Sequence, residues 1–359
     1  MRRGLIAWSK EEVPSATLDR RVSRLQAAMR EEGLDAVLAY TSFAQPGAVQ
    51  WLTHFVPYWS EALAVVPLSG MPTLLASLTP RVHPWIREVS HLAEVRSAPK
   101  LGDATVAFLR ELHDGAKRVG VIGLDTLPWS VGAPLYRALG ADKFCDASAL
   151  YASIRQPADA EEVALASVAA GIARDAIAAI PVDAKTVAHV LSAVEYAARC
   201  GGAEEVLLRC APDYRKGTAL RRIEGDAVLG ERYALEVTIA YKGAWVRVNH
   251  CDIARGGGAR PQSWHDAQAW FSAQLARFDP HAPAMTPPAD GIPMSWTFET
   301  CTGVYPLSVV SSHDRPPASV IANGTLGTLS IECELPDGPW RASAPVVLGH
   351  GDITAGSKV

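Results

Sequence analysis

The residues best suited to chemistry lie in one alternating segment of the sequence. Residues 235–241 and 244–249 each alternate apolar and polar side chains with period two, and Lys242-Gly243 between them suits a tight turn. This pattern predicts a β-hairpin with one apolar face and one polar face. The polar face carries Glu236, Thr238, Trp245, Arg247 and Asn249.

The predicted hairpin gathers a carboxylate, a guanidinium and an amide, because a two-residue turn places Glu236 opposite Asn249 and Thr238 opposite Arg247. A glutamate there could accept a proton or orient a water molecule. The arginine could hold a substrate carboxylate or a developing negative charge. The alternative interpretation is a solvated sheet surface or a structural ion pair between Glu236 and Arg247.

Roughly the first 150 residues alternate helical patterns with short apolar strands. Helices are expected at 17–33 and 104–113, and strands at 36–40, 62–68, 73–76 and 118–122. This alternation is typical of an α/β layer.

The pattern changes at Pro157, which breaks the preceding element. Asp159, followed by Glu162 three residues later, predicts a capped start for an Ala-rich helix that runs to about residue 180. Two more helices are expected at about 185–200 and 262–278, and mostly strands beyond residue 204. A chain of 359 residues is long enough for two domains, each with its own core.

The composition excludes several classes of protein. Lys and Arg number 34 against 38 Asp and Glu, so the net charge of -4 offers no basic excess for nucleic acid or an anionic membrane. Apolar residues make up 48% and charged residues 20%, which is typical of a folded globular protein. No segment approaches the ~20 apolar residues of a membrane span. We therefore expect a soluble protein whose partner is a small molecule.

The cysteines and the first residues predict a cytoplasmic location. The six cysteines lie far apart without a C-x-x-C pair, so we expect reduced thiols. The opening MRRGLIAWSKEEVP has too short an apolar stretch for a signal peptide.

Four stretches, in the same order along the chain, resemble segments of the creatinase, aminopeptidase P and prolidase family. Residues 24–36 resemble its opening helix and strand, 50–55 its "N-Y-L-T-G-F" segment, 154–162 its "R-x-I-K-S-x-x-E-I" segment and 327–332 its "G-M-V-x-S-I-E-P" strand. The resemblance covers nearly the whole chain. It implies a creatinase-type α/β N-terminal domain over 1–154 and an α+β pita-bread domain over 155–359.

The resemblance also implies a homodimer in which part of one N-terminal domain covers the partner's site. The matching stretch is 55–61, so Tyr58 and Trp59 are expected to line that site. Together with Trp245 and Arg247, such an aromatic lining suits a small amphipathic ligand, for example an amino-acid derivative.

Metal-dependent members of the family hold two divalent ions with two Asp, one His and two Glu. By position, these ligands correspond to Glu236, to Arg247, to a residue near Thr302, to Glu332, and to Ser343 or Ala344. An arginine cannot lose its proton to admit a metal ion, and two carboxylates do not offset two dications. The resemblance therefore predicts a family member with no metal at this site, and no other cofactor is expected.

Creatinase resembles these peptidases in fold, yet hydrolyses a C–N bond without metal by means of a histidine and carboxylates. Residues 210–230, where its histidine is expected, contain none. His313, in a stretch similar to the family's "H-E-x-P", is the first candidate for a general acid or base, and a surface loop histidine is the alternative. His250 is a second candidate, although alternation puts it on the opposite face from Arg247. Cys301, near the position of the family's "G-H-G", is either a nucleophile or an inert thiol.

Two functions follow, with a third held open. The first is a metal-independent enzyme that hydrolyses a C–N bond of a small amino-acid-like substrate; a lyase or isomerase would use the same groups. Its expected catalytic residues are Glu236, Glu332 and His313, and its expected substrate-binding residues are Arg247, Trp245, Thr302, Tyr58 and Trp59. The second is an inactive pita-bread protein that binds a ligand or peptide, and the third is a metallopeptidase with other ligands. The retained charges favour an enzyme, because buried charges are costly unless they are used.

Overall fold

A computed structural model describes most of the chain. The described residues are 8–42, 47–57, 60–112, 115–223, 227–254, 258–282, 285–288, 292, 294–300, 308–313 and 321–353. The chain divides into two compact units, Arg2–Arg155 and Gln156–Val359. The sequence predicts this boundary one residue earlier.

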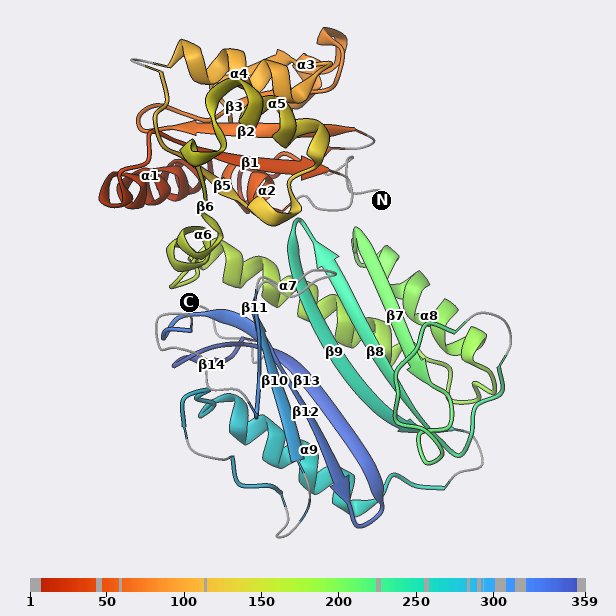
Figure 1. Cartoon of the computed structure of the whole chain (residues 1–359). Helices are drawn as coiled ribbons and strands as arrows, with labels where there is room; N and C mark the ends of the chain where they lie inside the picture. The colour runs from red at the N-terminus through yellow and green to blue at the C-terminus, as the bar shows by residue number, and fades with distance from the viewer. Residues whose placement is uncertain are drawn as a thin grey trace. The chain divides into compact units, whose positions relative to one another are not determined.

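The N-terminal unit is built on a six-stranded sheet with strand order β4-β3-β2-β1-β5-β6. Its strands are β1 (Ala36–Ser42), β2 (Glu61–Pro67), β3 (Thr73–Ala76), β4 (Glu94–Ser97), β5 (Val119–Ile122) and β6 (Phe144–Asp146). Its helices are α1 (Ser15–Glu32), α2 (Gly47–Thr53), α3 (His83–Glu88), α4 (Leu101–Glu111), α5 (Trp129–Leu139) and α6 (Ser148–Ile154), with short 3₁₀ turns η2 (Pro80–Val82), η3 (Leu124–Thr126) and η4 (Ala141–Lys143). The predicted α/β layer is therefore present (Figure 1).

Helix α1 illustrates why the N-terminal predictions succeed. Leu18, Leu25 and Met29, spaced at helical intervals, are completely buried. Gly33 ends the helix in the left-handed conformation, at φ 66°, which a glycine adopts without steric cost.

In the described residues of the C-terminal unit, two helices pack against a three-stranded sheet and one helix packs against a five-stranded sheet (Figure 1). The first layer comprises α7 (Ala160–Ala178), α8 (Val187–Cys200), β7 (Glu205–Ala211), β8 (Arg232–Tyr241) and β9 (Ala244–Ile253). The second comprises α9 (Gln262–Leu275), β10 (Met294–Thr300), β11 (Ser308–Ser311), β12 (Leu326–Leu335), β13 (Gly338–Val347) and β14 (Gly351–Asp352). Their strand orders are β7-β8-β9 and β11-β10-β12-β13-β14.

The start of α7 follows the predicted capping pattern. The Asp159 side chain accepts a hydrogen bond from the Glu162 backbone N–H at 2.8 Å. This bond satisfies one of the backbone donors that a helix leaves unpaired at its first turn.

Each sheet of the C-terminal unit has one apolar and one polar face. The apolar face of β8 and β9 packs on α7 and α8 through Leu235, Val237, Ile239, Val246 and Val248, as the alternation predicts. The apolar face of the second sheet packs on α9 through residues such as Trp296, Phe298, Ile331 and Trp340. The residues between them in sequence, which point to the other face of each sheet, are largely polar.

Candidate active site

The β8–β9 hairpin has the register that the sequence predicts. Glu236 pairs with Asn249 and Thr238 with Arg247, and Tyr241 and Ala244 are the last paired residues before the turn. Lys242 and Gly243 both have positive φ, at 45° and 85°, as a two-residue turn that matches the strand twist requires. The polar face of the hairpin is therefore fixed by local sequence.

The second sheet contributes a matching polar row. Cross-strand pairing places Glu299 on β10 opposite Thr328 on β12, two positions from the pair formed by Thr297 and Ser330. Residues two apart on a strand share a face, so Glu299 lies on the side opposite the buried Phe298.

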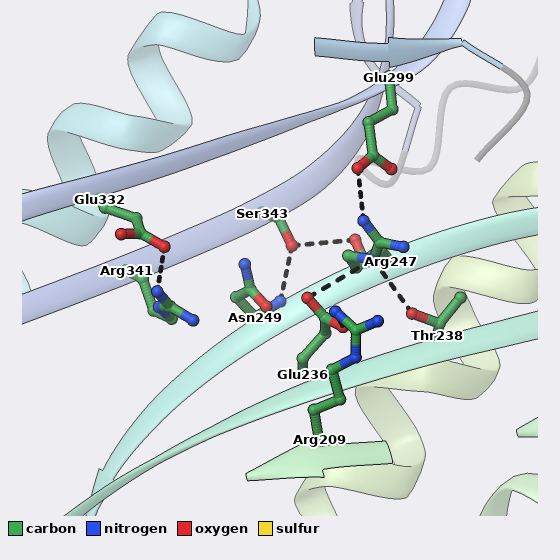
Figure 2. A network of polar contacts seen from close by, with 9 residues as sticks. All are labelled: Arg209, Glu236, Thr238, Arg247, Asn249, Glu299, Glu332, Arg341 and Ser343. Atoms are coloured by element: carbon green, nitrogen blue, oxygen red, sulfur yellow. Dashed lines mark hydrogen bonds and ion pairs between the residues drawn. The ribbon is translucent and has the colours of Figure 1, made fainter. Parts of the chain in front are cut away.

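Arg247 joins the two polar faces (Figure 2). Its Nη1 donates to Glu299 Oε1 at 2.6 Å, and its Nε donates to Thr238 Oγ1 at 3.2 Å. Its Nε also lies 3.6 Å from Glu236 Oε2. The three charged side chains are only 10% to 14% exposed, so the guanidinium is the cation that allows two carboxylates to stay buried.

The backbone on either side of this network is tied to β13 through one hydroxyl (Figure 2). Ser343 Oγ accepts a hydrogen bond from the Asn249 N–H at 2.7 Å and donates one to the Arg247 carbonyl at 3.1 Å. Ser343 thus holds the two sheets together where Arg247 crosses between them.

Two buried acceptors in the network have no hydrogen-bond partner among the residues that the structure describes. Glu299 Oε2 and Asn249 Oδ1 are both inaccessible to solvent and have no partner within the described ranges. A buried acceptor without a donor costs free energy, typically about 1–3 kcal/mol. Such acceptors are suited to binding a proton or a donor group of a ligand.

Glu332 forms a separate ion pair on the same sheet face, with Arg341, the residue opposite it on β13 (Figure 2). Arg341 is buried, and its Nε donates to Tyr214 Oη at 3.1 Å. Burial raises the pKa of Tyr214 well above its usual value, so this phenol stays neutral. The Glu332 side chain itself is 54% exposed.

The other predicted site residues fall in different places. Trp245 lies opposite Ala240 near the turn of the hairpin and is half-buried. His313 lies in the turn after β11; its backbone N–H donates to Ser311 Oγ, and its side chain is exposed. Tyr58, Trp59, Cys301 and Thr302 lie outside the described residues.

His250 lies on the face opposite Arg247, because the β8–β9 pairing is regular to Ile253. Its Nε2 lies 3.3 Å from Asp252 Oδ2. Burial raises the pKa of Asp252, but hydrogen bonds from His250 and Arg260 outweigh it and lower that pKa well below its usual value.

Two charged residues of the network, Glu299 and Arg209, are not among the predicted site residues. Glu299 alternates with Trp296 and Phe298 along β10, so period-two alternation in 294–300 was the available signal. Arg209 on β7 pairs with Glu236, and its Nη1 lies 3.6 Å from Glu236 Oε1 (Figure 2). The sequence feature that pointed to Arg209 was its position on the strand that precedes β8.

The donor set does not fit the pair of divalent ions of metal-dependent family members. By the resemblance, the position of the second Asp carries Arg247, whose guanidinium directly contacts Glu299. The position of the last Glu carries either Ser343, whose hydroxyl is already hydrogen-bonded, or Ala344, whose side chain cannot bind a metal. Within the described part of the chain, no three His, Cys, Asp or Glu side chains form a group able to hold a metal ion.

None of the helices in the described part of the chain is long and apolar enough to cross a bilayer.

Comparisons with known proteins agree with this architecture. A model of the creatinase/prolidase N-terminal domain matches residues 21–156. No curated protein matches the sequence.

Solved structures match over nearly the full length. Dipeptidase PepE from Mycobacterium ulcerans is 17% identical, with a TM-score of 0.65 over 96% of this chain and 97% of that chain. The prolidase from Pyrococcus horikoshii OT3 is 14% identical, with a TM-score of 0.67 over 94% and 99%. The Xaa-Pro dipeptidase from Bacillus anthracis is 16% identical, with a TM-score of 0.64 over 95% and 99%.

The N-terminal unit is therefore a creatinase/prolidase N-terminal domain, and the chain as a whole has the creatinase and prolidase fold. The predicted resemblance and the predicted fold class, an α/β domain followed by an α+β pita-bread domain, are confirmed.

Proposed function

We propose that the protein is a hydrolase that cleaves a C–N bond in a small amino-acid-like substrate without a metal ion. One observation carries the proposal: Arg247 bridges two buried carboxylates from facing sheets, and Glu299 Oε2 is left without a hydrogen bond within the described residues. The guanidinium supplies the positive charge that divalent ions supply in metal-dependent members of the family.

Glu299 is the proposed catalytic base. Its Oε1 is fixed by Arg247, so its Oε2 is held in one orientation and can accept a proton. Arg247 acts as a positioning residue, and Glu236 and Thr238 in turn orient Arg247. Glu332 and His313 receive no role in this scheme, because both side chains are exposed, whereas the Glu299 side chain is only 12% exposed.

The proposed reaction needs only water and the substrate. In the proposed step, the substrate admits one water molecule to the buried Oε2 of Glu299, which accepts a proton from that water while the water oxygen forms a bond to the carbonyl carbon. The C–N bond then breaks, and the same proton passes from Glu299 to the leaving nitrogen. The products are a carboxylic acid and an amine, and Glu299 returns to its ionised form.

A second candidate function is ligand binding without turnover. It is favoured by the pairing itself, because Glu236 and Glu299 both pair with Arg247, as carboxylates do in a structural ion-pair network. On this account the same polar faces bind an amino-acid derivative or a peptide but perform no chemistry.

The two functions are separated by a hydrolysis screen in the presence of a metal chelator. Dipeptides and N-acyl amino acids are incubated with wild type, Glu299→Gln and the matched control Glu231→Gln, whose glutamate pairs with Arg215 at the surface. We expect wild-type turnover, about a 10²–10⁴-fold loss in Glu299→Gln and no change in the control. Saturable binding without hydrolysis by wild type would favour the binding protein.

The resemblance also leads us to propose a homodimer, with Tyr58 and Trp59 contributed to the partner's site. Sedimentation velocity tests this directly, because a dimer has twice the chain mass. A monomer at all concentrations would contradict it.

A further inference from the structure

Glu236 lies between two arginines of very different accessibility. Arg247 Nε lies 3.6 Å from one carboxylate oxygen and Arg209 Nη1 lies 3.6 Å from the other. The Arg247 side chain is 14% exposed, whereas the Arg209 side chain is 58% exposed. Both contacts are longer than a direct hydrogen bond, but Arg209 is far more accessible to solvent than Arg247.

The two guanidinium groups differ in what their release would cost. Moving Arg247 away would leave Glu236 and Glu299 buried without the cation that bridges them, which is strongly unfavourable. Moving Arg209 away leaves Glu236 with Arg247 still beside it. The Arg209 side chain is 58% exposed and lies 3.6 Å from Glu236, so Arg209 is the arginine that can release Glu236 and bind another carboxylate.

The surroundings of Arg209 suit an aliphatic ligand. Leu207 lies two residues earlier on the same face of β7, opposite Thr238, and its side chain is 39% exposed. An exposed leucine beside an exposed arginine offers one apolar contact and one planar pair of donors for a carboxylate. Both side chains adjoin the buried network through their partners on β8.

We infer that Arg209 binds the carboxylate of the substrate, with Leu207 in contact with the substrate's aliphatic part. Arg247, the expected carboxylate-binding residue, instead positions Glu299. This assignment rests on the proposed function and adds to it a substrate class: small acids with an aliphatic side chain, held at the rim of the polar face. Arg209 is a specificity residue that does not touch the reacting bond.

The test compares two probes that differ only in charge, N-acetyl-L-leucine and N-acetyl-L-leucinamide. Their binding is measured by calorimetry, so no turnover is required. Arg209→Gln removes the charge from an exposed side chain and should fold normally. Arg215→Gln is the matched control, because Arg215 forms an exposed pair with Glu231 at 2.7 Å.

We expect wild type and Arg215→Gln to bind the acid about tenfold more tightly than the amide, because only the acid forms a charge-assisted pair with Arg209. Arg209→Gln should bind the two probes equally. Wild type that binds neither probe, or both equally, would overturn the assignment, as would an acid preference that survives in Arg209→Gln. An acid preference lost only in Arg209→Gln, in a protein that hydrolyses no substrate, would support the assignment and reject the proposed hydrolase.

Discussion

In the C-terminal unit, the carboxylates of Glu236 and Glu299 are largely shielded from solvent beside the Arg247 guanidinium, whereas in the N-terminal unit His54 is buried as a neutral ring. His54 is 5% exposed and stacks on Trp8 with ring centroids 6.1 Å apart. Burial, together with nearby Arg21, lowers the pKa of His54 to about 4. A buried side chain therefore keeps its charge where the fold provides an opposite charge, and loses it where the fold does not.

The largest effect is expected from Arg247→Met, which removes the shared cation of the buried carboxylates. We expect the free energy of unfolding of the C-terminal unit to fall by about 3–5 kcal/mol, because Glu299 loses the guanidinium that contacts it directly and Glu236 keeps only the exposed Arg209. Urea unfolding measures this loss. In the control Arg215→Met, the loss should be about 1 kcal/mol or less, since both side chains of that pair are over 40% exposed. Equal losses in the two variants would contradict the comparison.

A somewhat smaller loss of stability is expected for the N-terminal unit when the pH is lowered. The pKa of His54 is about 4 in the folded state and 6.5 for an ordinary histidine. Below pH 6.5 the unfolded chain binds a proton at His54 before the folded protein does. The free energy of unfolding is therefore highest above pH 6.5 and falls by about 3 kcal/mol in total as the pH approaches 4. Hydrogen exchange of the α1 and β1 amides between pH 7 and pH 4, corrected for intrinsic rates, follows this loss.

His54→Gly provides the matching control, because His54 has φ 66°, a conformation that glycine adopts without strain. The variant should be less stable than wild type at neutral pH. Its stability should no longer fall between pH 6.5 and pH 4, because the titrating imidazole is absent. An unchanged pH dependence would mean that another group in the N-terminal unit titrates.

The smallest effect is expected from Glu332→Gln. Glu332 is half-exposed, and a glutamine in its place can still accept a hydrogen bond from Arg341. Arg341 also keeps its hydrogen bond to Tyr214 Oη. We expect a loss of about 1 kcal/mol or less in urea unfolding. A loss as large as that of Arg247→Met would show that the exposure of a carboxylate does not predict how much its ion pair contributes to the free energy of unfolding.

The parts of the site that were predictable are those determined by local sequence. The register of the β8–β9 hairpin follows from period-two alternation around Lys242-Gly243, and the start of α7 follows from Asp159 and Glu162. Those elements place Glu236 and Arg247 on one face before any long-range contact is known.

Glu299 could not be found in the same way, because its contact with Arg247 spans 52 residues of sequence. It depends on the pairing of β10 with β12 and on the approach of β9 to β13 through Ser343. The pairing of Glu332 with Arg341 similarly depends on the register of the β12–β13 hairpin, which sequence analysis did not derive. The fold could be predicted from the resemblance to the family. The roles of the residues that replace the family's metal ligands could be inferred only from their contacts.

The most direct test of the central claim, that Arg247 replaces metal ions in this fold, combines elemental analysis with thermal unfolding. The purified protein is measured as isolated, after treatment with a chelator, and after addition of Mn²⁺, Co²⁺ or Zn²⁺. A metal bound to the native state must raise its stability. We predict no stoichiometric metal and no change in Tm under any of these conditions. Near-stoichiometric metal, or a Tm that rises with one of the ions and falls with the chelator, would contradict the claim.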